Sequence, residues 1–274
     1  MKRILTALAT TLALFAGLFL MGSQAQAATT ATVSVVHGVP NTPVNVFVNG
    51  KLTLTDFKPG TVAGPLQLPA GSYTVTVFPA SNLKGTGTPV IQATATLTGG
   101  GNATLVAHLS AAGKPVLTAF VNDTAPIAAG KARVVVRHTA AAPAVDVRAN
   151  AQAAFKDLAN PNQMMADLPA GSVSADVVLA GTSTVVIGPA TLDLAEGTQT
   201  IVYAVGSANA KTLSLVVQKI TGLGSAPSGM PAGSGGLAEP NAGAPAWVWL
   251  LTVLGVLLAV TGGAQTVRAA RARR

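Results

Sequence analysis

The sequence of 274 residues is 49% hydrophobic and only 9% charged, which is too apolar for a disordered chain and leaves room for one or two domains. It contains no cysteine, and this excludes disulfides, thiolate metal sites and a cysteine nucleophile. Most of the net charge of +8 lies at the two ends, since residues 28–243 hold eleven Lys/Arg against nine Asp/Glu. We therefore expect no nucleic-acid partner, because such a partner requires a basic face on the folded part.

The N-terminal segment has the three parts of a secretory signal. Lys2 and Arg3 form a basic start, residues 4–21 are an apolar run, and Ala25-Gln26-Ala27 is a small-residue cleavage site. This pattern predicts a signal peptide over residues 1–27 and an exported chain. An uncleaved N-terminal anchor is the alternative.

The segment after the signal has the pattern of short β-strands. Valine and other apolar residues alternate with polar ones, and β-branched residues dominate. Asn49-Gly50 favours a two-residue hairpin turn, and Pro69-Ala70-Gly71 is typical of a turn that precedes a strand. We expect about seven strands among eight candidate ranges: 32–37, 44–48, 51–55, 64–68, 72–78, 90–97, 102–109 and 116–122.

The same pattern returns about 100 residues later. Leu68-Pro-Ala-Gly-Ser72 recurs letter for letter as Leu168-Pro-Ala-Gly-Ser172, and His37 at the end of the first candidate strand matches His138. Matches in the same order at nearly constant spacing indicate two copies of one domain. In the second copy the hairpin at 149–152 lacks the Asn-Gly pair, and residues 160–165 suggest a longer loop.

The fold prediction is all-β, with two tandem antiparallel β-sandwich domains of an immunoglobulin-like or prealbumin-like type. The first repeat is assigned to residues 28–122 and the second to residues 132–221, joined by a linker at 123–131.

The C-terminal part predicts a membrane anchor. A Gly/Ser/Pro-rich stalk at 222–243 precedes residues 244–264, which carry no charge and as a helix would span roughly 30 Å, the thickness of the hydrocarbon layer. Trp247 and Trp249 suit the outer interface, and the basic tail at 265–274 suits the cytoplasmic side. We expect a single-pass cell-membrane protein with its N-terminus outside the cell and the bilayer as partner of residues 244–264.

This C-terminus also resembles that of Gram-positive wall-anchored proteins. Leu237-Ala238-Glu239 is similar to the first half of a sorting pentapeptide, but Pro240 and Asn241 stand where the motif has Thr-Gly. Because sortase forms its acyl-enzyme at that threonine, the sequence favours simple membrane anchoring. Wall attachment by sortase is the alternative.

Residues 37–50, His-Gly-Val-Pro-Asn-Thr-Pro-Val-Asn-Val-Phe-Val-Asn-Gly, resemble the opening of a bacterial family of domains of unknown function, family 4397. Residues 138–147 are similar, and both copies have the Leu-Pro-Ala-Gly turn of that family. The resemblance implies an exported, often tandem, β-sandwich module. It implies no activity.

Histidines are the first candidates for a site. His37 and His138 occupy equivalent positions and would be able to bind a metal or a carboxylate. We favour a structural role in which each ends the first strand and bonds a neighbouring turn, because no other ligand lies at metal spacing. His108, on an expected strand, has less support.

Polar residues near the turns offer no catalytic pattern. Asn45 and Asp146 are expected to face solvent or cap a turn, and an amide in one copy argues against a shared mechanism. Asp56, Asp157 and Asp167 form no calcium-loop motif. We therefore predict no catalytic, cofactor-binding or metal-binding residue.

The predicted function is a non-enzymatic surface protein that is structural or adhesive. Binding of a glycan or cell-wall polymer is the alternative, with an unidentified extracellular protein or glycan as partner, and a hydrolase is least favoured. The expected ectodomain has no tryptophan on which a sugar would stack, and we interpret its glycan sequons at Asn102 and Asn122 as chance matches.

Overall fold

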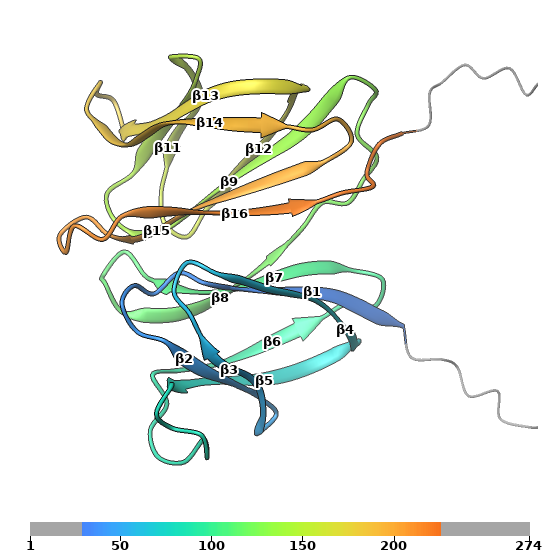
Figure 1. Cartoon of the computed structure of the whole chain (residues 1–274), viewed down its shortest axis with the longest axis vertical. Helices are drawn as coiled ribbons and strands as arrows, with labels where there is room; N and C mark the ends of the chain where they lie inside the picture. The colour runs from blue at the N-terminus through green and yellow to red at the C-terminus, as the bar shows by residue number, and fades with distance from the viewer. Residues whose placement is uncertain (1–28, 226–274) are drawn as a thin grey trace, which may run out of the picture. The chain divides into compact units, whose positions relative to one another are not determined.

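The computed structural model describes residues 29–225, which form sixteen β-strands and no helix (Figure 1). The all-β prediction is thus confirmed for this part of the chain. The predicted signal peptide, most of the stalk, the predicted span at 244–264 and the basic tail lie outside the described residues. Within residues 29–225, no helix has the length and apolar character needed to cross a membrane.

The first eight strands make one sandwich, here called the first sandwich. All eight candidate ranges form strands, within a few residues of the expected bounds. They are β1 (Thr30–His37), β2 (Val44–Val48), β3 (Lys51–Phe57), β4 (Val62–Pro69), β5 (Gly71–Pro79), β6 (Ile91–Leu97), β7 (Asn102–Leu109) and β8 (Pro115–Val121).

The next eight strands repeat this order and make the second sandwich. They are β9 (Lys131–Ala141), β10 (Val145–Ala149), β11 (Gln152–Leu158), β12 (Gln163–Pro169), β13 (Gly171–Leu179), β14 (Val185–Leu194), β15 (Gln199–Ser207) and β16 (Ser214–Ile220). The loop expected at 160–165 is shorter than predicted. Gln163, Met164 and Met165 already pair with β9, so their backbone groups are used in the sheet.

Each sandwich contains two four-stranded sheets. In the first sandwich, the order β4-β1-β7-β8 faces β3-β2-β5-β6, and the second repeats it as β12-β9-β15-β16 facing β11-β10-β13-β14. The immunoglobulin alternative is excluded, because that fold keeps its first two strands in one sheet, whereas β1 and β2 lie in different sheets. The prealbumin-like alternative agrees with two four-stranded sheets.

The sheets are not wholly antiparallel, which corrects one part of the prediction. β1 runs parallel to β7, and β9 runs parallel to β15. The turn at 98–101 starts β7 beside the beginning of β1, since Gly100 N–H donates to Thr30 O at 2.8 Å and Thr32 N–H donates to Gly101 O at 2.9 Å. The apolar–polar alternation is the same for both strand directions, so the sequence pattern did not distinguish them.

The expected hairpin turn is present in both copies. Asn49 and Gly50 have φ values of 50° and 76°, as a type I′ turn requires. Asn150 and Ala151 adopt φ values of 50° and 63° at the equivalent place. The second hairpin therefore forms without glycine, with an alanine held in the left-handed region.

Three apolar cores hold the fold. One lies inside each sandwich, built from inward-facing residues of its two sheets. The third, here called the junction, is shared by the two sandwiches. The junction contains Val36, Val106 and Phe120 of the first sandwich and Val135, Ile201, Tyr203, Val205 and Val216 of the second.

Candidate functional site

His37 and His138 each bond a neighbouring turn, as the sequence favoured, but only His37 ends its strand, because β9 continues past His138 to Ala141. Each is only 1% exposed, and its Nε2 lies 2.9 Å from a turn carbonyl, that of Thr42 or of Pro143. A carbonyl only accepts, so Nε2 carries the hydrogen and donates. Burial lowers the pKa of both side chains, and each Nδ1 is buried without a hydrogen-bond partner. Both histidines are therefore neutral, and each holds its neighbouring turn through one hydrogen bond.

His108 also bonds within the protein. Its Nε2 lies 2.8 Å from Thr118 Oγ1 and its Nδ1 lies 2.9 Å from Leu109 O, and burial lowers its pKa. Among residues 29–225, no three His, Asp or Glu side chains gather as metal ligands would. The candidate histidines are thus each occupied by local contacts.

Asn45 braces the loops at one end of the first sandwich. It is fully buried, and its Nδ2 donates to Ala80 O at 3.0 Å and Asn82 O at 2.9 Å. Its Oδ1 accepts the N–H of Asp56 at 2.9 Å. This confirms the turn-capping alternative and rules out the solvent-facing one for this residue.

Asp146 occupies the equivalent position in the second sandwich and holds the adjacent loops with a carboxylate. Its two oxygens accept the N–H of Asp157 at 2.8 Å and of Gly181 at 3.0 Å. These bonds stabilise the charged form and lower the pKa of Asp146. In both copies a side-chain oxygen accepts the N–H of the aspartate eleven residues later, Asp56 or Asp157. An amide and a carboxylate can both supply this acceptor oxygen.

The junction holds a buried arginine that the sequence analysis missed. Arg137 is 1% exposed on β9. Its Nε donates to Gln163 Oε1 at 2.8 Å, its Nη1 to the Tyr203 hydroxyl at 2.8 Å, and its Nη2 to Asn122 Oδ1 at 2.7 Å. Its guanidinium carbon also lies 4.5 Å from the centre of the Phe120 ring. The cation is therefore held by neutral oxygens and an aromatic face.

The partners of Arg137 are bonded in turn. The Tyr203 hydroxyl donates to Gln218 Oε1 at 2.6 Å, and Thr104 Oγ1 donates to the same oxygen at 3.2 Å. Asn122 Nδ2 donates to Asn102 Oδ1 at 2.6 Å. Burial lowers the pKa of Arg137 and raises the pKa of Tyr203. This network joins side chains of both sandwiches in one buried cluster.

One signal in the sequence points to this cluster. Position 137 in the second repeat aligns with Val36 in the first, so an arginine replaces a core valine in an apolar strand. The charge of the neighbouring Arg133 is balanced by carboxylates, unlike that of Arg137. It pairs with Asp167 at 2.8 Å and with Asp123 at 3.1 Å.

A cavity of about 430 Å³ lies between the two sheets of the first sandwich. Its wall is mostly apolar. It is lined by Val33, Val35, Val46, Val48, Asn49, Lys51, Leu52, Thr53, Leu54, Leu66, Leu68, Tyr73, Val75, Ala95, Leu97 and Leu105. Because β3 and β4 are edge strands and contribute exposed or half-buried residues to this wall, the cavity opens between these two edges.

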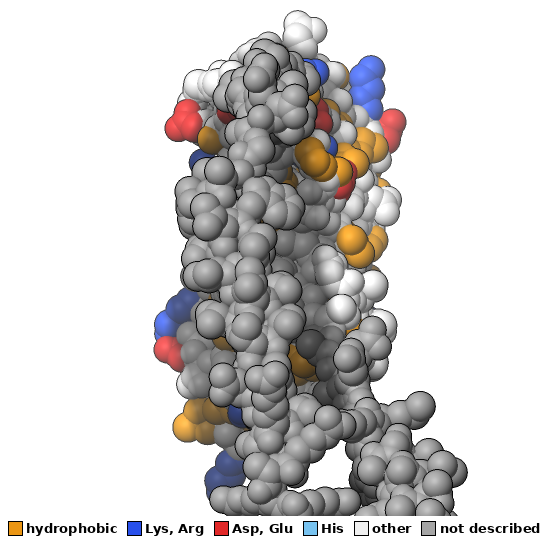
Figure 2. All heavy atoms as spheres, turned by 90° about the vertical axis from the view of Figure 1, so that its right-hand side faces the viewer, with side chains coloured by type: hydrophobic (Ala, Val, Ile, Leu, Met, Phe, Trp, Pro, Cys, Tyr) orange, Lys and Arg blue, Asp and Glu red, His pale blue; other side chains and the backbone are white. Residues whose placement is uncertain are grey.

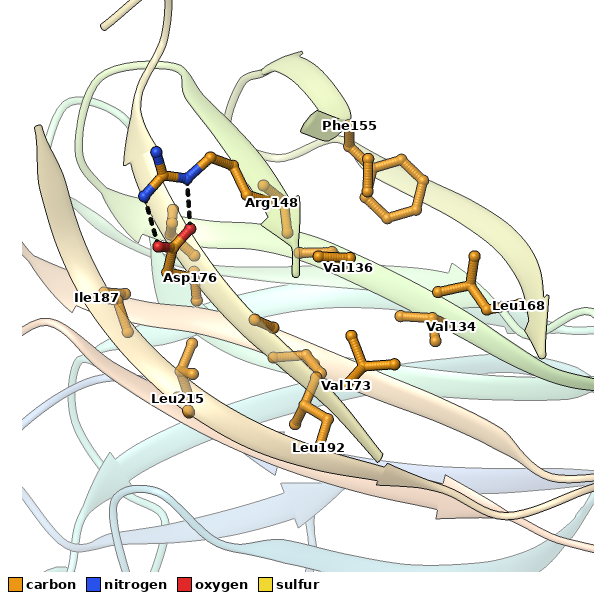
Figure 3. Close-up of a pocket in the computed structure, with 18 of the residues that line it drawn as sticks. Val134, Val136, Arg148, Phe155, Leu168, Val173, Asp176, Ile187, Leu192 and Leu215 are labelled. Carbon is orange, nitrogen blue, oxygen red and sulfur yellow. Dashed lines mark hydrogen bonds and ion pairs between the residues drawn. The ribbon is translucent and has the colours of Figure 1, made fainter. Parts of the chain in front are cut away.

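The corresponding space in the second sandwich is almost filled. It measures about 50 Å³, and Figure 3 shows the Phe155 ring among its lining side chains. Arg148 and Asp176 form an ion pair at its rim, with Nε and Oδ1 2.7 Å apart. The two repeats therefore share a fold but differ in the space they enclose.

These features define a tandem β-sandwich protein whose repeats share a buried junction. Residues 31–148 match the family model described as Domain of unknown function (DUF4397). The match runs from β1 through the first sandwich into β10 of the second. No curated protein matches the chain.

Proposed function

We propose that the chain is a non-enzymatic cell-surface protein that displays its two sandwiches as one rigid structural or adhesive module. In this proposal residues 1–27 direct export and residues 244–264 hold the protein in the cell membrane. The N-terminal side, with both sandwiches, lies outside the cell, and residues 265–274 lie in the cytoplasm.

The buried junction is the observation that supports this proposal most. Both sandwiches fall within one compact unit, and the junction combines an apolar core with the Arg137 network. A flexible pair of independent modules needs no buried cation between them. A module with a fixed internal geometry suits a spacer or an adhesive surface.

The surface features agree with this proposal. On the face drawn in Figure 2, acidic, basic and apolar side chains are interspersed where described residues are visible. Of the aromatic residues in the described part, Phe47, Phe78, Phe120, Phe155 and Tyr203 are buried. Glycan binding by aromatic stacking gains no support from their placement.

Protease shaving of intact cells, followed by fractionation, tests the proposal. We expect the sandwiches to be released and a short C-terminal stub to stay in the membrane fraction. Covalent recovery in the wall fraction would instead favour sortase attachment. Protection of the sandwiches in intact cells would contradict surface display.

A further inference from the structure

We propose that the first sandwich binds a single-chain lipid with an anionic head group, such as a fatty acid, in the cavity between its sheets. The chain would lie among the apolar side chains, and the head group would lie at the mouth beside Lys51. This inference goes beyond surface display and does not depend on it.

The size of the cavity is the first argument. Protein interiors are packed so closely that voids larger than a water molecule are few. A space of 430 Å³ corresponds to about 14 water molecules at their liquid volume and falls within the range of ligand pockets. Its wall is too apolar to hold that much ordered water, so an apolar occupant fits it better.

The polar groups at the mouth give the second argument. The Asn49 Oδ1 accepts the N–H of Thr74 at 2.8 Å, the Tyr73 hydroxyl donates to Pro69 O at 2.7 Å, and the Thr53 hydroxyl donates to Lys51 O at 3.1 Å. Among the described residues, the Lys51 ammonium forms no ion pair. It is the cation available to an anionic head group.

The charge of the first sandwich points the same way. Residues 29–122 contain four lysines and a single carboxylate, Asp56, which pairs with Lys58 at 2.7 Å. Residues 132–221 contain six basic and six acidic residues. The sandwich with the large cavity is thus the one with an excess of positive charge.

The second sandwich provides an internal comparison. By strand register, Leu54 opposite Val46 corresponds to Phe155 opposite Val147. Lys51, opposite the last residue of β2, corresponds in the same way to Gln152. In the second copy the cation at the rim, Arg148, is already paired with Asp176, the side chain inside is larger, and the space measures about 50 Å³. The large volume and a cation without an ion pair therefore occur together in the first sandwich only.

Photo-crosslinking of the full-length chain in the cells that express it tests this proposal. The probe is a palmitic acid analogue with a photoreactive diazirine and an alkyne handle, and its methyl ester is the uncharged control. Adducts are mapped by peptide mass spectrometry. We expect them on the wall of the first sandwich, within residues 46–75, and competition by unlabelled palmitic acid.

Two variants make the test specific. Leu54→Phe copies the second sandwich and should reduce adducts on residues 46–75 by about tenfold, or about 1.4 kcal/mol of binding free energy. Lys51→Gln should reduce labelling by the acid about threefold, the effect of one exposed ion pair, and leave labelling by the ester unchanged. A melting temperature of Leu54→Phe at or above that of the parent chain shows that the variant is folded.

Adducts confined to other parts of the chain, including residues 244–264, would overturn the proposal. Labelling of residues 46–75 that persists undiminished in a folded Leu54→Phe variant would overturn it as well. Neither result bears on whether the sandwiches are displayed outside the cell, which protease shaving decides separately.

Discussion

Replacing Tyr203 by phenylalanine removes one hydroxyl from the junction and leaves the ring in place. Tyr203 is fully buried, and its hydroxyl accepts from Arg137 at 2.8 Å while it donates to Gln218 at 2.6 Å. Without it, one N–H of a buried guanidinium has no acceptor. Gln218 Oε1 keeps the bond from Thr104.

The expected loss follows from these contacts. A hydrogen bond to a charged group contributes about 1.5–3 kcal/mol and a neutral one about 1 kcal/mol. Tyr203→Phe should therefore lower the free energy of unfolding by about 2–4 kcal/mol. For a folded part of this size, that corresponds to a fall in melting temperature of about 5–15 °C.

The chain provides a matched control, since its other tyrosine is Tyr73. The Tyr73 hydroxyl donates to Pro69 O in an exposed setting, so Tyr73→Phe should change the free energy of unfolding by about 0.5 kcal/mol or less. Urea denaturation followed by circular dichroism measures both variants. Equal losses, within about 0.5 kcal/mol, would refute the argument that the junction network stabilises the fold.

Three further predictions test other parts of the structure. Gly38→Ala should lower stability by about 1–3 kcal/mol in calorimetry, because its Cβ would lie 2.8 Å from a valine side chain of the second sandwich; an unchanged melting temperature would contradict this packing. Burial lowers the pKa values of His37 and His138 in the folded state. Their contribution to the free energy of unfolding is therefore full above about pH 6.5 and is lost as pH falls through their folded pKa. Urea midpoints should decline from about pH 7.5 to about pH 5, and the decline should be smaller in His37→Gln; a flat profile would show that the histidines are not buried neutral. Phe155→Ala should lower the free energy of unfolding by about 3–5 kcal/mol, and Leu54→Ala by less than about 2 kcal/mol because it already borders open space; the reverse order in chemical denaturation would contradict the two cavity sizes.

The sequence was sufficient to predict the local structure. Period-two alternation placed the strands, and Asn49-Gly50 placed the first hairpin, because both depend on neighbouring residues alone. The same holds for His37, which bonds a carbonyl only five residues away. Contacts between residues this close in the sequence can be predicted from one short stretch of chain.

Long-range pairing could not be predicted in the same way. The parallel pairing of β1 with β7 joins residues about 70 positions apart, and the alternation of either strand fits both directions. The burial of Arg137 could not be predicted from its own stretch of chain, because its acceptors are Asn122, just after β8, and Tyr203 in β15. The cavity depends on the summed volume of side chains from two sheets, which no local pattern encodes.

The linker between the repeats has a mechanical consequence. Ile127 is fully buried, its N–H donates to Leu223 O at 2.6 Å, and its carbonyl accepts from Ser225 N–H at 2.8 Å. The chain that leaves the second sandwich is thus fastened, in parallel, to the segment that enters it. A pull applied beyond residue 225 loads these bonds in shear before it can unzip β16. Tension from the C-terminal side therefore reaches the connection between the two sandwiches first, so the two share the load.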